Sequence, residues 1–279
     1  MPGTLFLVAT PLGNLGDVTY RAVETLRTAT AVVAEDTRRA RILCERYGIE
    51  RPLVSMPAFR ELDQADALVA RLVKGDDLAL ITDAGSPGIS DPGTALVARA
   101  IEAGVRVVPI PGPSAVVAAL SASGLPTDRF FFAGFLPRKG TGRERAFSLL
   151  KRLDATLVLY ESPERLGETL KELQEAFGDR RAVVARELTK IHEEFARGRL
   201  SQLAARFAGE VRGEITVIVE GAAEDESAAA TDEAVLAEVE RRLAAGEGSV
   251  KEISAEIAQA TGRKRREVYD LALKAKGKK

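Results

Sequence analysis

The chain has 279 residues, of which 46% are hydrophobic and 29% charged, and its formal net charge at pH 7 is −1. This length accommodates two domains of ordinary size, and the composition is typical of soluble globular proteins. The near-zero charge excludes a general electrostatic attraction to nucleic acid or to a membrane, so such a partner would have to meet a local patch. No apolar run approaches the roughly 20 residues of a membrane span, and no basic segment precedes the first apolar run, so we expect no membrane anchor and no signal peptide.

The sequence contains one cysteine and one histidine, which restricts the chemistry available to it. Cys44 alone forms neither an internal disulfide nor a cysteine-clustered zinc site, and His192 alone cannot make a two-histidine metal site. A Ser-His-Asp triad would have to use His192, but the sequence has no Gly-x-Ser-x-Gly elbow. We therefore expect no metal site, and any chemistry must use carboxylates, hydroxyls, lysines, backbone dipoles or a cofactor.

The first part of the chain alternates short apolar runs with helical patterns. Short continuous apolar runs are typical of buried strands. Strands are predicted at residues 4–9, 31–34, 52–56, 78–81 and 105–110, and helices at 18–29, 37–47, 61–74, 93–103 and 115–123. This alternation predicts a parallel sheet with right-handed crossovers.

Residues 80–92 form the most elaborate connection, Leu-Ile-Thr-Asp-Ala-Gly-Ser-Pro-Gly-Ile-Ser-Asp-Pro. A strand-to-helix connection needs only about two to six residues, and α/β proteins bind ligands at the carboxyl ends of their strands. We interpret this stretch as a ligand-binding loop, with a purely structural turn as the alternative. Ser90 or Asp91 is expected to cap the next helix, with Pro92 in its first turn.

Three other loops follow predicted strands. Residues 10–17, Thr-Pro-Leu-Gly-Asn-Leu-Gly-Asp, lack the Gly-Lys-Ser/Thr of a P-loop, and Asp17 is expected to cap the next helix. Glu35 and Asp36 follow the second strand and could be catalytic carboxylates. The alternative is that Asp36 or Thr37 caps the next helix, with the arginines after it as ion partners. Residues 109–114 contain three prolines, Ser114 is expected to cap the helix after them, and we place a domain boundary here.

The second half has a different pattern. Strands are predicted at 129–134, 156–160, 182–188 and 214–220, and helices at 143–152 and 161–177, with a basic loop at 135–143. Because fewer helices separate the strands, a mixed sheet is expected.

The end of the chain is set apart by composition. Residues 222–231 are acidic and alanine-rich, as in a linker. Helices are predicted at 232–245, 250–261 and 263–274, and the last two are spaced as in a helix-turn-helix. From Ser249 onward, nine lysines and arginines face four acidic residues, which favours nucleic-acid contact over a merely solvated helix face.

Eight segments in order over residues 4–221 resemble the ribosomal RNA small subunit methyltransferase I family. They begin with Ala9-Thr-Pro-Leu-Gly-Asn-Leu-Gly-Asp17, Glu35-Asp-Thr-Arg38, Thr82-Asp-Ala-Gly-Ser-Pro-Gly-Ile-Ser-Asp-Pro-Gly93 and Pro111-Gly-Pro-Ser114. They continue with Gly134-Phe-Leu-Pro137, Tyr160-Glu-Ser-Pro163, Arg186-Glu-Leu-Thr-Lys190 with Glu193-Glu194, and Gly213-Glu214 through Glu220-Gly221. One departure is Ser86, where the family often has threonine, and the hydroxyl is kept.

The resemblance implies an α/β tetrapyrrole-methylase fold with a parallel-sheet N-terminal domain and a mixed-sheet second domain. We expect these at residues 1–113 and 114–222, a linker at 223–231 and a basic helix-turn-helix-like module at 232–279. It further implies a cytoplasmic homodimer that uses S-adenosylmethionine (SAM). The implied reaction methylates the ribose 2′-hydroxyl of a cytidine in the decoding region of small-subunit (16S) rRNA.

The resemblance also implies a SAM site in the cleft between the two domains. The family's cofactor residues correspond here to Pro11, Gly85, Ser86, Pro87, Gly88, Ile89, Ser114, Ala115, Arg186, Glu187, Gly213 and Glu214. Methyl transfer from a sulfonium needs mainly alignment of the reacting atoms, which fits a site built from glycines, prolines and backbone groups.

A ribose hydroxyl is a weak nucleophile, so a general base or stabilisation of the developing charge would help the reaction. The candidate bases are Glu35, Asp36, Asp83 and Glu187, and the candidate cations are Arg186 and Lys190. We expect Asp83 and Lys190 to matter most because they stand at strand ends facing the cleft. The alternative for Asp83 is an Asx turn that holds its own loop.

RNA would be bound by basic residues of the 135–143 loop and of the C-terminal module. These are Arg138, Lys139, Arg143, Arg263, Lys264, Arg265 and Arg266. The substrate would be free rRNA or the assembled small subunit. Two alternatives remain: a methyltransferase acting on a tetrapyrrole or another small molecule, and a non-catalytic RNA-binding factor for ribosome assembly.

Overall fold

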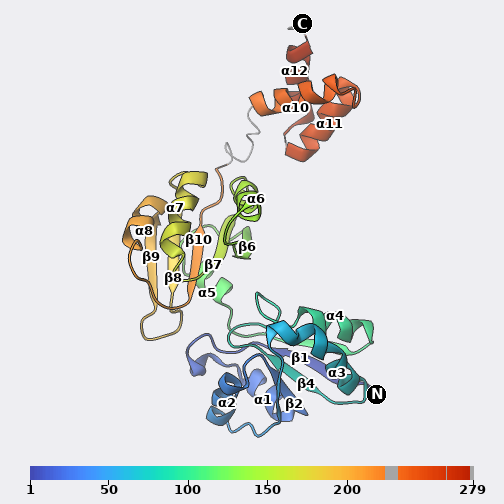
Figure 1. The fold of residues 1–279 in the computed structure, drawn as a ribbon, viewed down its shortest axis with the longest axis vertical. Coiled ribbons are helices and arrows are strands. Elements are labelled where there is room, and N and C mark those ends of the chain that lie inside the picture. Colours follow the sequence, from blue (N-terminus) through green and yellow to red (C-terminus); the bar gives the residue numbers. More distant parts are fainter. Residues whose placement is uncertain (224–231, 262, 277–279) are drawn as a thin grey trace.

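The computed structural model describes residues 1–223, 232–261 and 263–276 (Figure 1). Within them lie two five-stranded sheets and a separate group of three helices. The linker expected at 223–231 lies outside the described residues except for Ala223. No helix of the described residues is both long and apolar enough to cross a membrane.

The first sheet is fully parallel, with strand order β3-β2-β4-β1-β5. Strands β2 and β4 of this sheet are continuous apolar runs that are buried along their whole length, as in a sheet covered on both faces. The strands are β1 (Thr4–Val8), β2 (Ala31–Ala34), β3 (Leu53–Ser55), β4 (Leu78–Ile81) and β5 (Arg106–Ile110). The predicted parallel sheet is confirmed.

Two pairs of helices cover the two faces of this sheet. Leu26 and Cys44 belong to one core cluster, which packs α1 (Tyr20–Thr28) and α2 (Thr37–Arg46) on one face. Leu72 and Leu96 belong to another, which packs α3 (Glu61–Val73) and α4 (Thr94–Glu102) on the other face. The parallel strands therefore end together at one edge, where the loops predicted to bind ligands lie.

Two of the predicted helix caps are wrong. Asp17 lies in the 3₁₀ turn η1 (Leu15–Asp17), and the hydroxyl of Thr19 caps α1 instead. Helix α4 starts after Gly93, whose φ of 136° belongs to a glycine conformation, so neither Ser90 nor Asp91 caps it. Asp36 does cap α2, as the structural interpretation of that residue predicted.

The second sheet is mixed, with strand order β6-β7-β10-β8-β9. β6 (Phe130–Phe135) and β7 (Thr156–Glu161) are parallel, whereas β10 (Ile215–Val219), β8 (Arg181–Arg186) and β9 (Glu194–Arg199) pair antiparallel. Strand β9 and helix α8 (Leu200–Arg206) were not predicted. The edge strand β9 carries charged residues among its apolar ones and so lacks a continuous apolar run.

Helix α5 (Ala115–Ser121) joins the two sheets. Ser114 caps it, as predicted, and Val116 and Leu120 pack with Val158 and Ile218 of the second sheet. The opposite face of that sheet packs α6 (Thr141–Leu150), α7 (Leu166–Phe177) and α8. In Figure 1, α5 lies at the junction between the first sheet below and the second sheet above.

The C-terminal helices share their own core. They are α10 (Asp232–Ala244), α11 (Val250–Thr261) and α12 (Arg265–Lys276). Val235, Val239, Ile253, Ile257 and Val268 are buried among them.

Candidate active site

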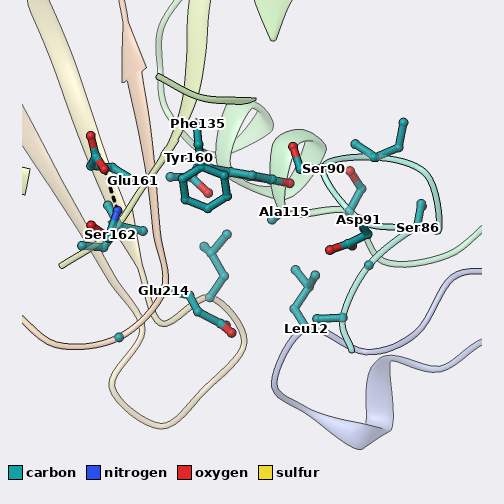
Figure 2. Close-up of a pocket in the computed structure, with 18 of the residues that line it drawn as sticks. Leu12, Ser86, Ser90, Asp91, Ala115, Phe135, Tyr160, Glu161, Ser162 and Glu214 are labelled. Carbon is teal, nitrogen blue, oxygen red and sulfur yellow. Dashed lines mark hydrogen bonds between the residues drawn. The ribbon is translucent and has the colours of Figure 1, made fainter. Parts of the chain in front are cut away.

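A cavity of about 330 Å³ lies between the two sheets (Figure 2). Its walls come from the loops after β1, β4 and β5, from the ends of β6 and β7, and from the start of β10. Residues of the first domain, Leu12, Ser86 and Asp91, lie on one side, and Tyr160 and Glu214 lie on the other. The volume falls in the range of small-molecule sites, roughly 300–1,000 Å³.

Contacts with neighbouring segments hold the loop after β4 in shape. Thr10 and Gly85 exchange two backbone hydrogen bonds, of 2.9 and 3.0 Å, and Gly85 has a φ of 77°. Ser90 has a φ of 61°, which is unusual for a residue with a side chain. A Cβ on Gly134 of β6 would lie 3.3 Å from the Ser90 Oγ, so the loop packs closely on the second sheet. Such strained positions concentrate at functional sites.

The cavity is lined by three carboxylates and, among the described residues, by no lysine, arginine or histidine. Glu161 is buried and accepts hydrogen bonds from the Thr169 hydroxyl (2.6 Å) and the Ser162 N–H (2.8 Å), with Arg165 at 3.3 Å. Glu214 forms an ion pair of 3.1 Å with Lys190. Asp91, the third, is half-buried.

Asp91 has a strongly perturbed environment. Burial raises its pKa to about 6, and the nearby charge of Asp83 contributes, against a hydrogen bond from the Thr82 side chain. Burial and the charge of Asp91 also raise the pKa of Tyr160 to about 12. The pKa of Glu35 is raised by burial and then by Asp83 and Asp91. These carboxylates therefore share one electrostatic environment.

Asp83, predicted to be catalytic, does not line the cavity. Its Oδ2 lies 3.4 Å from Arg39, and its buried Oδ1 has no hydrogen-bond partner among the described residues. The Asx-turn interpretation is wrong, because the N–H of Gly85, two residues further on, donates to the Thr10 carbonyl and not to the Asp83 side chain. Within the described part of the chain, no three His, Cys, Asp or Glu side chains come together as a metal site would require.

Glu187 and Lys190 are bound to each other instead of facing the cavity. The Lys190 ammonium donates to Glu187 Oε1 at 2.8 Å, and that oxygen also accepts the Glu214 N–H at 3.1 Å. The hydrogen bond from Lys190 lowers the pKa of Glu187. Burial lowers the pKa of Lys190, but the hydrogen bonds to Glu187 and Glu214 outweigh it and raise the pKa.

Two glycines make room for this ion pair. A Cβ on Gly13 of the first domain would overlap the aliphatic chain of Lys190, and a Cβ on Gly213 would overlap the carboxylate of Glu187. Lys190 therefore lies across the backbone of the loop after β1 and connects the two domains. Glu187 itself has a φ of 52°, so the loop after β8 is strained here.

About half of the predicted cofactor residues line the cavity. These are Gly85, Ser86, Ile89, Ser114, Ala115, Gly213 and Glu214. The cavity walls do not include Pro11, Pro87, Gly88, Arg186 or Glu187. The prediction missed lining residues in both halves, chiefly Leu12, Ser90, Asp91, Phe135, Tyr160, Glu161 and Leu188. Phe135, Tyr160 and Glu161 stand in segments that carried the family resemblance, which was the available signal.

The predicted RNA-binding residues fall into two groups. Arg138, Lys139, Lys264, Arg265 and Arg266 are exposed. Two other arginines are engaged within the protein, which argues against phosphate contacts. Arg143 is only 8% exposed and donates to Glu172, Thr169 and the Pro137 carbonyl. Arg263 forms an ion pair of 2.7 Å with Asp232.

Comparison with known proteins identifies two families along the chain. Residues 4–204 match the family of tetrapyrrole (corrin/porphyrin) methylases, and residues 228–276 match the RsmI C-terminal HTH domain. Among solved structures, diphthine synthase aligns with a TM-score of 0.63 and 20% identity over 81% of this chain and 93% of that one. The methyltransferase CobJ aligns with a TM-score of 0.61 and 23% identity, over 80% and 95% of the two chains. These structures show the shared fold.

Relatives of the same name span almost the whole chain. The ribosomal RNA small subunit methyltransferase I of Xylella fastidiosa (strain Temecula1) is 50% identical over 83% of this chain and 86% of its own length. Those of Synechocystis sp. and Pseudomonas aeruginosa are both 43% identical, over 97% and 99% of this chain and 98% and 99% of theirs. The chain therefore belongs to the ribosomal RNA small subunit methyltransferase I family, within the tetrapyrrole methylases.

Proposed function

We propose that this chain transfers a methyl group from SAM to the ribose 2′-hydroxyl of a cytidine in the decoding region of small-subunit (16S) rRNA, in the cytoplasm. The observation that carries the proposal is the charge of the cavity. Three carboxylates and no basic side chain line its described walls. Such a lining suits a ligand with a positively charged sulfur and disfavours a phosphorylated nucleotide. The names of the relatives support small-subunit rRNA as the substrate.

The walls also suit the shape and polarity of SAM. Leu12, Phe135 and Leu188 give apolar surface for an adenine ring, while Ser86 and the backbone around Gly85 give polar groups. We propose Gly85, Ser86, Ile89, Ser114, Ala115, Gly213 and Glu214 as direct contacts. The other predicted cofactor residues would not touch SAM but would fix the conformation of the lining loops. They are Pro11, Pro87, Gly88, Arg186 and Glu187.

Bound SAM supplies a methyl group that its positively charged sulfur has already activated. The main task of the chain is then to align the ribose oxygen with that methyl group, and such positioning supplies up to about 7–11 kcal/mol in favourable cases. Lys190 serves this task by joining Glu187 and Glu214 and by lying on Gly13, so that the two domains hold the cavity together. Its ammonium is neutralised by two carboxylates, which favours this structural role over stabilisation of an alkoxide.

We propose that RNA is held by the exposed cations of two separate regions. Arg138 and Lys139 project from the loop after β6, and Lys264, Arg265 and Arg266 surround the start of α12. The match of residues 228–276 to a helix-turn-helix domain supports this role for the module. We further propose the domain division 1–113, 114–222 and 232–279, and a homodimer, which light scattering after gel filtration would test.

The function is tested by supplying methyl-labelled SAM and three separate acceptors. The acceptors are small ribosomal subunits from cells that lack this chain, the protein-free 16S rRNA from them, and a tetrapyrrole. Label in rRNA, as a 2′-O-methylcytidine, is the expected result. Label in the tetrapyrrole alone would favour the second candidate, which the family of residues 4–204 suggests. Tight RNA binding without label in any acceptor would favour a non-catalytic assembly factor.

A further inference from the structure

We propose that Tyr20 and Ile191 hold the bases of unpaired rRNA nucleotides next to the target cytidine, outside the cavity proposed for SAM. This inference rests on the proposed function and adds to it a surface that recognises bases rather than phosphates. Tyr20 is the first residue of α1 in the first domain. Ile191 lies in the second domain, in the connection between β8 and β9.

Both side chains are almost fully exposed. Tyr20 is 95% exposed and Ile191 93%, values that only Met1 exceeds among the large apolar side chains of the described residues. Neither packs against a hydrophobic core in the described part of the chain. Burial of such a side chain stabilises a protein, and two side chains left in water forgo that gain. Single exposed apolar residues are common, so it is the positions of these two that point to a partner.

The two connections that carry these side chains meet beside the cavity. A Cβ on Gly13, in the connection after β1, would lie 2.3 Å from the Lys190 Cγ. In Figure 1 the connection between β8 and β9 reaches toward the connection after β1. The same two connections supply Leu12 and Leu188 to the cavity wall. A nucleotide whose ribose enters the cavity therefore has its neighbours near this meeting point.

Hydrogen bonds hold Ile191 in a fixed position. The Lys190 N–H donates to the Glu187 carbonyl and the Glu193 N–H donates to the Lys190 carbonyl, both at 3.0 Å. The Glu193 carboxylate accepts the Thr189 N–H at 2.7 Å, which closes the connection around Ile191. Glu187 and Thr189 have φ values of 52° and 66°, and such strain persists where the surroundings fix the backbone. An apolar side chain presented in this way loses little freedom when it binds a partner.

Tyr20 is also presented by a fixed backbone. The Thr19 hydroxyl caps α1 by accepting the Ala22 N–H at 3.1 Å, so the helix has a defined start at Tyr20. A tyrosine ring gives a large contact area at a low cost in entropy, because its side chain has only two rotatable angles. The exposed Arg21 follows it and donates to the Pro109 carbonyl at 3.3 Å. This acceptor is neutral, so the contact does not cancel the charge that Arg21 offers to a phosphate.

Unpaired RNA fits these two side chains better than a second copy of the chain does. Exposed polar residues follow each of them, Arg21 after Tyr20, and His192 and Glu193 after Ile191. A standard protein interface covers about 800 Å² on each partner, whereas one large aromatic side chain covers about 150–250 Å². Bases of unpaired RNA, by contrast, stack singly on aromatic side chains. Isoleucine is one of the apolar residues that insert between base steps of nucleic acids.

The role of the two side chains is positioning. A cytidine whose ribose enters the cavity leaves the stack of its neighbours, whose bases then lose contact on one side. Tyr20 and Ile191 replace that contact from outside the cavity, which fixes the ribose with respect to the methyl group. These contacts exist before and during the reaction, so they lower KM for the RNA and have little effect on kcat.

The test is steady-state methylation of small ribosomal subunits by Tyr20→Ala and Ile191→Ala. We expect KM for the subunits to rise about 5-fold or more in each variant, because stacking contributes roughly 5–150-fold in affinity per base. The kcat should stay within twofold of the wild type. Tyr20→Phe and Ile191→Leu keep the apolar contact and should restore KM. Ile101→Ala is the matched control, because Ile101 is 61% exposed but lies at the end of α4 that is remote from the cavity.

A second measurement links each side chain to a base. Small subunits are reconstituted with rRNA that lacks one base next to the target cytidine, at each neighbouring position in turn. For the wild type, loss of a contacted base should raise KM by about the same factor as the alanine substitution. For the variant that lacks the contacting side chain, the same missing base should raise KM no further, because the effects of groups in contact are not additive.

The expected KM values require a wild type that methylates rRNA. With such a wild type, an unchanged KM in both alanine variants would overturn the role of these residues, and so would additive effects at every base position. Weaker SAM binding in calorimetry would assign them to the cofactor site, and a halved mass in light scattering would assign them to a dimer interface. Both variants should melt at the wild-type temperature, because neither side chain is buried. A wild type that leaves rRNA unmethylated would overturn the proposed function, and this role with it.

Discussion

Asp91 should reduce the stability of the fold at neutral pH. The folded protein raises the pKa of this carboxyl from 3.8 to about 6, so it binds the proton more tightly than the unfolded chain does. Stability is therefore lost as pH rises from below 4 to above 6. An asparagine at this position does not ionise, so Asp91→Asn should not lose stability in this way as pH rises.

We accordingly compare the free energy of unfolding of Asp91→Asn with that of the wild type. The difference should shift in favour of the variant by about 1–2 kcal/mol between pH 4 and pH 8, a value reduced to allow for the partial exposure of Asp91. Urea denaturation at both pH values measures this change. Asp128→Asn is the control, because the side chain of Asp128 is exposed. A gain of equal size at both pH values would mean that ionisation of Asp91 does not strain the fold.

Gly213 should be indispensable to the cavity for two reasons. Its φ of 94° disfavours any side chain, and a Cβ there would overlap the carboxylate of Glu187. Gly213→Ala should therefore displace Glu187, release Lys190 and lower SAM affinity about 10-fold or more. Gly124→Ala is the matched control, because Gly124 has a φ of 79° but open space around it. Calorimetry that finds equal SAM affinity in both variants would refute this account of Gly213.

At the scale of elements, α6 and α7 are joined by Arg143, which the sequence had indicated as an RNA ligand. Its guanidinium is buried against Glu172, Thr169 and the Pro137 carbonyl. Arg143→Ala should therefore cost about 1–3 kcal/mol of stability, with RNA affinity unchanged at temperatures where the variant is folded. Arg138→Ala, in contrast, should lower RNA affinity and leave stability unchanged, because Arg138 is exposed. Weaker RNA binding by Arg143→Ala with an unchanged melting temperature would show that Arg143 contacts RNA and does not stabilise the fold.

The predictability of the elements follows their burial. Strands β2 and β4 were predicted with their observed bounds because both are continuous apolar runs, buried on both faces. β9 was missed because an edge strand needs no such run. Asp91 was misassigned because a residue of its type just before a helical pattern usually caps it, whereas Gly93 displaces the start of α4. A sequence pattern does not show which way such a loop folds.

At the scale of the whole molecule, the cavity depends on packing between two domains. The cavity wall that belongs to the first domain was predictable from the sequence, because the parallel strands of the first sheet end at a common edge. The lining by Phe135 and Tyr160 was not predictable in this way, since their approach to the loop after β4 depends on how the second sheet packs on the first. The positions of these aromatic residues are a property of the tertiary structure, which local periodicity does not contain.

The exposed cations of the C-terminal module should account for part of the salt dependence of RNA binding. Each phosphate contact adds about 0.7–0.9 log units of affinity loss per log unit of salt. Replacing Lys264, Arg265 and Arg266 by Ala in the full chain should flatten this slope by up to about 2, while SAM binding stays unchanged because the module has its own core. An unchanged slope in filter-binding titrations would exclude these three residues from RNA contact.

The proposed function is tested most directly by a nucleotide-resolution map of 2′-O-methylation on small-subunit rRNA. Cells that lack this chain would be compared with cells that express it. We predict one methylated cytidine in the decoding region that is lost without the chain and restored by the wild type. An identical methylation map in the presence and absence of the chain would contradict the proposed function.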